Sequence, residues 1–336
     1  MSMSFTSHWN KKMFRFFLRL CLPFVLLIAC SPRATLTPGA NGMPTTEPSM
    51  IPTPAAPKFI VLAYVTDGIF ADIIPYDKLT HINYSFLTPK ADGTFNPINN
   101  GWKLKQIAET ADQHGVKVSI SVGGWGWDAQ FVELAAEPES RTAFVQNLKA
   151  FVDEYQLDGV DVDWEYPDPG PSSQNFLTLI RELRIAMPDK LLTTAVVSHG
   201  DANGLGVPGE SFALFDIVNI MTYDGPDHGT MEQFERGLSY WSGRGLPKEK
   251  IVMGVPFYGD PNLPYFKIVA ADPNAAQTDT FEYHGATYHY NGIPTIQAKT
   301  RMAMEQASGI MFWTLDHDAQ GDLSLLNAIH QTVQEP

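Results

Sequence analysis

Cysteine is almost absent from this sequence: Cys21 and Cys30 are the only two among 336 residues. The chain beyond residue 30 therefore has no disulfide, no thiolate nucleophile and no cysteine ligand for a metal ion. Basic residues are also in the minority, because 23 Lys and Arg stand against 37 Asp and Glu, and the formal net charge is −14. Nucleic-acid phosphates would be repelled by such a chain, so a neutral or cationic substrate fits better.

A long apolar run is missing as well, and the N-terminus has the layout of a targeting segment. The basic stretch "KKMFRFFLR" is followed by the short apolar run "LCLPFVLLIAC", which is too short for a confident membrane span and typical of a secretory signal. Residues 27–30, "LIAC", resemble a bacterial lipobox. That resemblance implies a signal peptide over residues 1–29 and a lipid on Cys30. An ordinary signal peptide cut nearby, or an uncleaved anchor, is the alternative.

The next segment has the composition of a tether. Residues 31–57 contain seven prolines and five threonines and show no hydrophobic period, as in a semi-extended linker. We therefore predict a Pro/Thr-rich tether over residues 30–57 and a folded domain over residues 58–336. Ser31 is not the aspartate that retains some lipoproteins at an inner membrane, so we expect an outward-facing protein at an outer membrane or cell surface.

From residue 58 onward, strand-like segments alternate with helix-like segments. Short β-rich runs are followed in most cases by helix-like segments, the weakest of which come after the first and fifth runs. The predicted strands are 59–66, 81–87, 117–124, 159–166, 191–198, 217–224, 251–259 and 309–316. Eight strand–helix units predict a (β/α)8 TIM barrel, an α/β fold of parallel strands. An open doubly wound sheet is the alternative, but "AYVTDGIF" after the first run is not a Gly-rich phosphate loop.

The fourth run, "DGVDVDWEYP" (158–167), carries four carboxylates. Side chains alternate along a strand, so Asp161, Asp163 and Glu165 share one face, while Val160, Val162 and Trp164 share the other. If the apolar set meets the helices, the acids face the lumen, at the C-terminal ends where barrel active sites lie. Alternate residues are roughly 6.6 Å apart. Crowded carboxyl groups should retain a proton, and a raised pKa suits a general acid.

Two other interpretations of the acidic run remain open. A hard cation could use the oxygen ligands of Asp-x-Asp-x-Glu, but one strand rarely surrounds an ion alone and no second ligand motif assists. A structural acid network is the other, although burying four idle acids costs much desolvation. We expect neither a metal ion nor a cofactor.

Four motifs together resemble glycoside hydrolase family 18, the chitinases and their relatives. "DGVDVDWEYP" resembles that family's Asp-x-x-Asp-x-Asp-x-Glu signature, and "SVGGW" (121–125) resembles its third-strand motif. "MTYD" (221–224) is similar to its sixth-strand motif, and "GIMFWTLDHD" (309–318) to its eighth strand. The resemblance extends over residues 58–336.

The resemblance implies hydrolysis with retention and with the substrate's own acetamido group as nucleophile. Glu165 would protonate the glycosidic oxygen and later activate water. Asp163 would orient the acetamido N–H, Asp161 would share a proton with Asp163, and Tyr223 would bind the acetamido oxygen. Trp313 would form the floor under the sugar. The further substrate-binding candidates are Tyr64, Phe86, Gly124, Trp125, Tyr166, Met221, Asp224 and Tyr258.

The segment between the seventh and eighth strands departs from deep-cleft members of that family. Residues 260–308 are too few for a full inserted α+β module beside a helix at 294–307, and "TFEYHGATYHYNG" suggests a small hairpin. A short or absent insertion implies an open groove and internal cleavage of chitin or chito-oligosaccharides. An endo-β-N-acetylglucosaminidase acting on N-glycans or peptidoglycan is the alternative, and a chitin lectin is a third. The expected partner is such a glycan, with no nucleic acid and with membrane contact only through the lipid.

Overall fold

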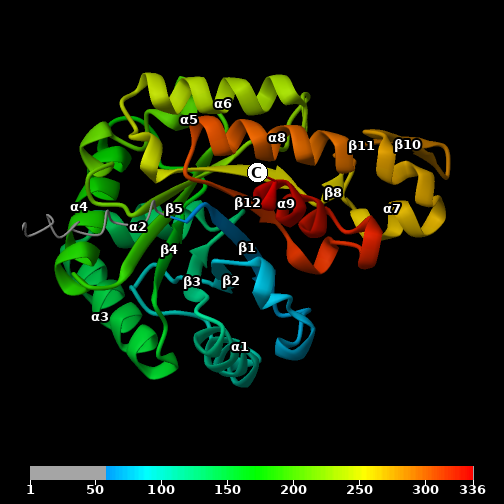
Figure 1. The fold of residues 1–336 in the computed structure, drawn as a ribbon. Coiled ribbons are helices and arrows are strands. Elements are labelled where there is room, and N and C mark those ends of the chain that lie inside the picture. Colours follow the sequence, from blue (N-terminus) through cyan, green and yellow to red (C-terminus); the bar gives the residue numbers. More distant parts are fainter. Residues whose placement is uncertain (1–57, 336) are drawn as a thin grey trace, which may run out of the picture. The chain divides into compact units, whose positions relative to one another are not determined.

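Eight parallel strands close into a barrel in the computed structural model, which describes residues 58–335 (Figure 1). Going around the barrel, the order is β1-β12-β7-β6-β5-β4-β3-β2. The strands are β1 Ile60–Thr66, β2 His81–Leu87, β3 Lys117–Gly123, β4 Gly159–Asp163, β5 Leu191–Val197, β6 Ile217–Met221, β7 Ile251–Pro256 and β12 Gly309–Trp313. The predicted TIM barrel is confirmed. The predicted signal peptide over 1–29, the tether over 30–57 and the lipidated Cys30 lie outside the described residues.

The predicted strands run up to three residues too far at their C-terminal ends. The fourth was expected over 159–166, but β4 ends at Asp163. Glu165 therefore lies in the loop that follows the strand. The seventh was expected over 251–259, and the structure divides it into β7 and a separate short strand, β8 Tyr258–Gly259.

Helices connect most of the strands, as the sequence predicts. They are α1 Gly101–Gln113, α2 Asp128–Ala136, α3 Pro138–Tyr155, α4 Pro171–Ala186, α5 Asp201–Gly204, α6 Met231–Gly243, α8 Ile293–Gln306 and α9 Leu325–Gln334. The connections after the first and fifth strands, where the predicted helices were weakest, contain little helix. Two 3-10 turns, Ala71–Ile73 and Tyr76–Lys78, follow β1, and only the four-residue α5 and a 3-10 turn follow β5. No helix in residues 58–335 is long and apolar enough to cross a membrane.

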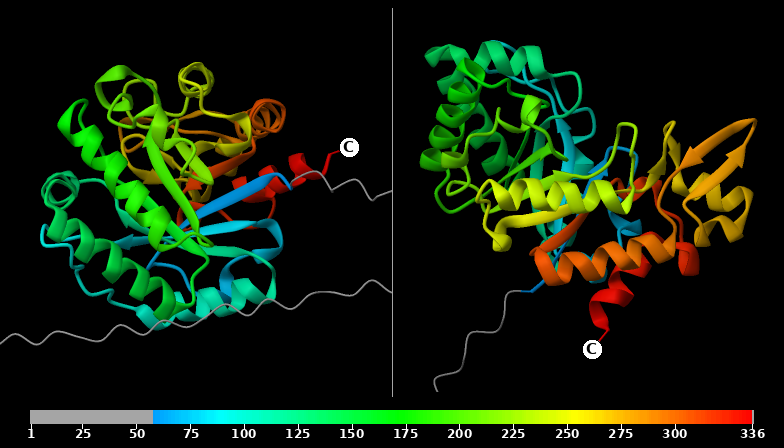
Figure 2. Two further views of the ribbon diagram at one scale, coloured as in Figure 1. Left: turned by 90° about the vertical axis from the view of Figure 1, so that its left-hand side faces the viewer. Right: turned by 90° about the horizontal axis from the view of Figure 1, so that it is seen from above.

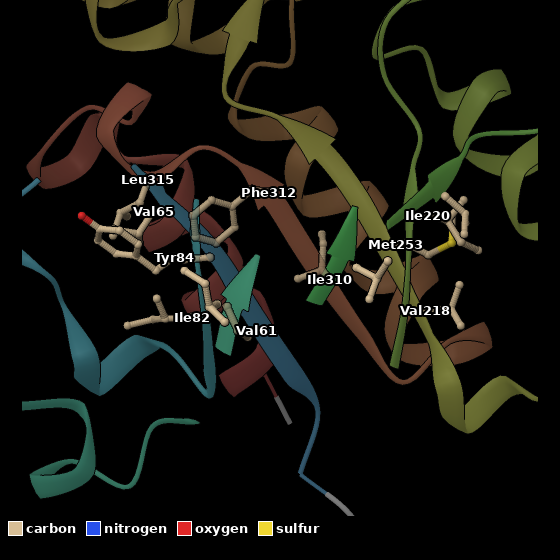
Figure 3. Packing of buried hydrophobic residues seen from close by; sticks show 14 of the residues in the cluster. Val61, Val65, Ile82, Tyr84, Val218, Ile220, Met253, Ile310, Phe312 and Leu315 are labelled. Atoms are coloured by element: carbon tan, nitrogen blue, oxygen red, sulfur yellow. The ribbon is translucent and has the colours of Figure 1, made fainter. Parts of the chain in front are cut away.

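The alternation of side chains divides the apolar residues into two clusters. The outer cluster lies between strands and helices and includes Val160, Val162 and Trp164 of the β4 segment. Figure 3 shows other members of it, with Val61 and Ile82 on neighbouring strands. The inner cluster fills the lumen and contains Leu62, Tyr64, Met221, Tyr223, Val252 and Met311. This division turns Asp161 and Asp163 inward, as their position in the sequence predicts.

The insertion between β7 and β12 is small. After β8 come β9 Leu263–Pro264, α7 Tyr265–Ala271, a 3-10 turn Pro273–Gln277 and an antiparallel hairpin of β10 Thr280–Tyr283 and β11 Ala286–His289. The predicted hairpin and short insertion are confirmed, whereas α7 was not predicted. The insertion lies on the opposite side of the barrel from α2–α4 in both Figure 1 and the right-hand view of Figure 2.

Candidate active site

Asp161 lies at the bottom of the acidic group and is fully hydrogen-bonded. Its carboxylate accepts hydrogen bonds from the hydroxyls of Tyr64 (2.9 Å), Ser121 (2.8 Å) and Thr193 (2.5 Å) and from the amide of Asn219 (3.3 Å). These donors come from β1, β3, β5 and β6, so the barrel's closure brings them to one point. Burial raises the pKa of Asp161, although the hydrogen bonds from Thr193, Ser121 and Tyr64 oppose the rise.

Asp163 lies two residues further along β4 and is far less satisfied. Its side chain is 3% exposed, and its Oδ1 receives no hydrogen bond from the described residues. Burial, followed by the charges of Glu165 and Asp161, raises the pKa of Asp163 well above its usual value. Its surroundings therefore disfavour the ionised form of this carboxyl group.

Glu165 extends beyond the strand toward the opening. Burial raises the pKa of its carboxyl to about 7; a hydrogen bond with Tyr166 opposes the rise and the nearby Asp224 charge adds to it. Such a pKa lets the group give up and regain a proton near neutral pH, as an acid–base catalyst must.

Trp164 anchors the turn that carries Glu165. Its ring lies outside the barrel, stacked on Phe131 with centroids 5.1 Å apart, and its indole N–H donates to Asp128 Oδ1 at 2.7 Å. On the inner side, Gly123 and Gly124 have φ values of +111° and +86°, and the Gly124 N–H donates to the Asp163 carbonyl at 2.8 Å. The ends of β3 and β4 are thus fixed together directly beneath the candidate site.

The inward-facing residues enclose a cavity of about 160 Å³ at the C-terminal ends of the strands. Every residue that lines it is a predicted site residue. They are Tyr64, Phe86, Trp125, Asp163, Glu165, Met221, Tyr223, Asp224, Tyr258 and Trp313. A second cavity of about 630 Å³ adjoins it and shares Met221, Tyr223 and Asp224.

Three predicted residues lie outside the lining of the smaller cavity. Asp161 is beneath Asp163. Gly124 supports the Phe86 ring, since a Cβ at position 124 would lie 2.8 Å from that ring. Tyr166 borders the larger cavity. The fourth acid of the run, Asp158, is at the opposite end of β4, where it pairs with Lys117 at 2.8 Å and accepts the Val118 N–H.

Aromatic rings form one wall of the cavity. Trp313 at the end of β12 has its ring centroid 5.4 Å from that of Phe86, nearly parallel at 21°, and 5.7 Å from that of Tyr64. Trp125, after β3, is 79% exposed at the cavity. Flat aromatic faces beside buried carboxyl groups suit a ligand that has both an apolar face and polar edges.

Another part of the lining comes from residues that follow β6 and β7. Tyr223 is buried, with its hydroxyl 3.9 Å from the sulfur of Met311. The Tyr258 hydroxyl donates to the Asp224 carboxylate, and Asp224 has a left-handed φ of +63°.

Sequence reasoning missed several residues that support this site. Thr193 and Asn219 were not singled out, although their positions on the inward faces of β5 and β6 are a signal that alternation could have supplied. His228 and Gln233 were also missed, because they act through backbone contacts. Within residues 58–335 no group of three or more His, Cys, Asp and Glu side chains is arranged to hold a metal ion.

The sequence is similar to known proteins over much of the described part of the chain. The model of the glycosyl hydrolases family 18 matches residues 60–318. A probable endochitinase of Caenorhabditis elegans is 31% identical over 224 residues, which are 54% of this chain and 36% of that protein. A chitinase-like effector of Moniliophthora roreri is 32% identical over 219 residues, which are 55% of this chain and 54% of that protein. The chain thus spans about a third to a half of the length of these curated relatives.

The fold also has close counterparts among solved structures. A chitinase from Bacteroides thetaiotaomicron superimposes with a TM-score of 0.75 at 32% sequence identity. The match covers 83% of this chain and 97% of that one.

Proposed function

Because this chain belongs to the glycosyl hydrolases family 18, we propose that it hydrolyses β-1,4-linked N-acetylglucosamine glycans, namely chitin or chito-oligosaccharides. The observation that carries the proposal is one cavity shared by Glu165, whose pKa is about 7, and by Asp163, whose buried Oδ1 lacks a partner among the described residues. The chitinases among the similar proteins support the same substrate class.

The proposed reaction begins with proton transfer from Glu165 to the glycosidic oxygen, and the C1–O bond breaks. The acetamido oxygen of the same sugar attacks C1, which gives a cyclic oxazolinium ion. Glu165, now a carboxylate, takes a proton from water as the water oxygen attacks C1 and the ring opens. Two inversions at C1 give net retention. An intramolecular nucleophile is effective because its position is fixed before reaction.

The neighbouring residues have distinct proposed roles. Asp163 accepts the acetamido N–H with its unpartnered oxygen, which stabilises the positive charge that develops on the ring. Asp161 stays at a fixed position beneath Asp163, so the charge next to Asp163 does not change during the reaction. Tyr223 donates a hydrogen bond to the acetamido oxygen. Trp313 contacts the apolar face of the sugar from below.

We further propose that cleavage is internal to the chain. The insertion between β7 and β12 contains only α7 and a two-stranded hairpin as its main elements. The cavity at Glu165 also continues into the larger cavity at Asp224. A glycan with sugars on both sides of the cleaved bond would fit such a site.

A product analysis tests the reaction and its stereochemistry. The purified protein is incubated separately with N-acetylchitohexaose, a cellulose oligomer and a high-mannose glycopeptide, and initial products are followed by proton NMR. We expect β-anomers from the chitin oligomer and no cleavage of cellulose, which lacks the acetamido group. Initial α-anomers, or equal cleavage of cellulose, would refute substrate assistance. Faster cleavage of the glycopeptide would assign the enzyme to N-glycans instead.

We also propose that Cys30 carries a lipid and that residues 30–57 tether the catalytic domain on the outer side of the cell envelope. The sequence "LIAC" before the Pro/Thr-rich segment supports this location. Cys30→Ala should move the protein from the membrane fraction to the supernatant of expressing cells. An unchanged distribution would refute the lipid anchor.

A further inference from the structure

His228 is a buried histidine in the loop between β6 and α6, outside the set of residues that line the smaller cavity. Its side chain is 2% exposed. Its Nδ1 lies 2.9 Å from the backbone nitrogen of Asp224, and its Nε2 lies 3.3 Å from the carbonyl oxygen of Tyr258. The ring also packs against the Tyr258 ring, with centroids 4.9 Å apart. His228 thus connects two residues that line the smaller cavity, Asp224 and Tyr258.

These contacts determine which ring nitrogen carries the proton. The Asp224 N–H donates to Nδ1, so Nδ1 is an acceptor, and Nε2–H then donates to the Tyr258 carbonyl. The Asp224 carboxylate is 3.6 Å from Nδ1. That contact would be an ion pair only if Nδ1 carried a proton, and the shorter hydrogen bond from the backbone excludes such a proton.

Gln233 on α6 also holds the backbone around Asp224. Its side-chain nitrogen donates to the carbonyls of Tyr223 (3.2 Å) and Asp224 (2.8 Å), and its side-chain oxygen accepts the Gly229 N–H (3.0 Å). Asp224 needs such support, because its φ of +63° is uncommon for a residue other than glycine. Two side chains thus hold the backbone on both sides of Asp224.

We propose that His228 is a positioning residue for the reaction: through its two hydrogen bonds it fixes Asp224 and Tyr258, which line the same cavity as Glu165. This inference deepens the proposed function and rests on it for the kinetic effect. His228 does not contact the substrate. It acts by fixing the Asp224 carboxylate and the Tyr258 hydroxyl that donates to it.

A positioning role predicts an electrostatic effect that a packing role does not. Burial is the main cause of the raised pKa of Glu165, and the Asp224 charge adds to it. The titratable groups around Glu165 are Asp163 on β4, Tyr166 after it, Tyr223 and Asp224 after β6, and Tyr258 after β7. Displacing Asp224 alone should lower the pKa of Glu165.

Two substitutions separate the two hydrogen bonds of His228. His228→Asn places an amide oxygen near the position of Nδ1 and retains the bond from the Asp224 N–H. His228→Gln reaches the position of Nε2 and retains only the bond to Tyr258. On N-acetylchitotetraose, we expect kcat/KM of H228N to stay within about fivefold of wild type, the effect of one hydrogen bond. H228Q should lose about 10²-fold, the effect of displacing a group at the site by about 1 Å.

His317 provides the matched control. Its ring faces the same Tyr258 ring at a centroid distance of 6.3 Å, and no hydrogen bond joins it to Asp224. His317→Asn and His317→Gln should have similar kcat/KM values, and thermal unfolding of all four variants is measured in parallel. Equal kcat/KM for H228N and H228Q, or losses that follow the melting temperature in both histidine pairs, would overturn the proposal.

A titration that needs no turnover separates this proposal from the proposed function. The carboxyl ¹³C shift of Glu165 is followed against pH in wild type, H228N and H228Q. We expect the midpoint of H228Q to lie below that of wild type and the midpoint of H228N to match wild type. Identical midpoints in all three proteins would overturn the positioning role, even if chitin oligomers are hydrolysed.

Discussion

Asp161 accepts four hydrogen bonds from other strands, whereas Asp163 Oδ1, two residues further along the same strand, accepts none within residues 58–335. The difference assigns the two acids to different tasks. Asp161 is a fixed part of the barrel interior. Asp163 has a buried oxygen that can accept a hydrogen bond from a ligand in the cavity.

Glu165→Gln should abolish hydrolysis while leaving sugar binding intact, because the amide has the size of the acid but no proton to transfer. A general acid–base residue contributes about 10²–10⁴-fold to the rate, so we expect kcat to fall by at least that factor. Calorimetric titration with N-acetylchitotetraose should give an affinity close to that of the wild type. Glu210→Gln, an exposed glutamate elsewhere, is the control; turnover of E165Q near that of E210Q would exclude Glu165 as the acid.

The rate of hydrolysis should fall as pH rises through the pKa of Glu165. The first step needs Glu165 protonated, and burial raises its pKa to about 7. In the free enzyme the protonated fraction is therefore high below pH 7 and declines above it. A plot of kcat/KM against pH should show a basic limb with a midpoint near that value. A rate that stayed constant from pH 6 to 9 would contradict the assignment.

Replacing Glu165 should also change how stability depends on pH. The ordinary pKa of a glutamate carboxyl is 4.5, and burial raises that of Glu165 to about 7 in the folded protein. The native state therefore retains a proton that the unfolded state loses between these values. The free energy of unfolding of the wild type therefore decreases as pH rises through this range, by up to about 3 kcal/mol. The free energy of unfolding of E165Q should not decrease in this way, because the glutamine side chain does not titrate. Urea unfolding at pH 4.5 and pH 8 measures this difference. Relative to the wild type, the free energy of unfolding of E165Q should be higher at pH 8 than at pH 4.5.

Thr193→Val should reduce both stability and activity, because it removes the 2.5 Å hydrogen bond to Asp161. We expect a loss of about 1–2 kcal/mol in the free energy of unfolding. Thr194→Val is a matched control on the same strand, since the Thr194 hydroxyl donates to the Val162 carbonyl at 2.7 Å. Both variants should lose similar stability, but only T193V should have a lower kcat. Equal kcat values would show that Asp161 has no influence on the reaction.

Asp128→Ala should destabilise the protein by about 1–3 kcal/mol, because it leaves the Trp164 indole N–H buried without an acceptor. Asp128→Asn retains an oxygen acceptor and should lose less. Thermal unfolding of the two variants measures the difference. A ranking with D128N below D128A would mean that the Asp128 charge, rather than the hydrogen bond, stabilises the turn.

The sequence predicted the barrel and the lining of its cavity because both depend on local alternation. Val160 and Val162 face the helices, so Asp161 and Asp163 must face the lumen. The strand ends were predicted less well. Trp164 continues the outward apolar pattern, so the pattern extends past the last ladder hydrogen bond and the sequence does not reveal that Glu165 has left the strand.

The supporting residues could not be predicted in the same way. Thr193 is an ordinary strand residue until barrel closure brings it to Asp161, and that contact joins segments far apart in the sequence. His228 lies in a loop, where no strand or helix period assigns a direction to its side chain. Its ring bonds to backbone groups of Asp224 and Tyr258, two residues that line the cavity.

The pairing of β1 with β12, in which Ile60 is opposite Gly309, has a consequence for biosynthesis. Until the last strand has been made, β1 and β7 both expose unpaired backbone groups, and such edges are templates for association between molecules. Contacts between residues so distant in the chain also form slowly. A product truncated before β12 should therefore aggregate, because the barrel cannot protect its own edges until β12 has been synthesised.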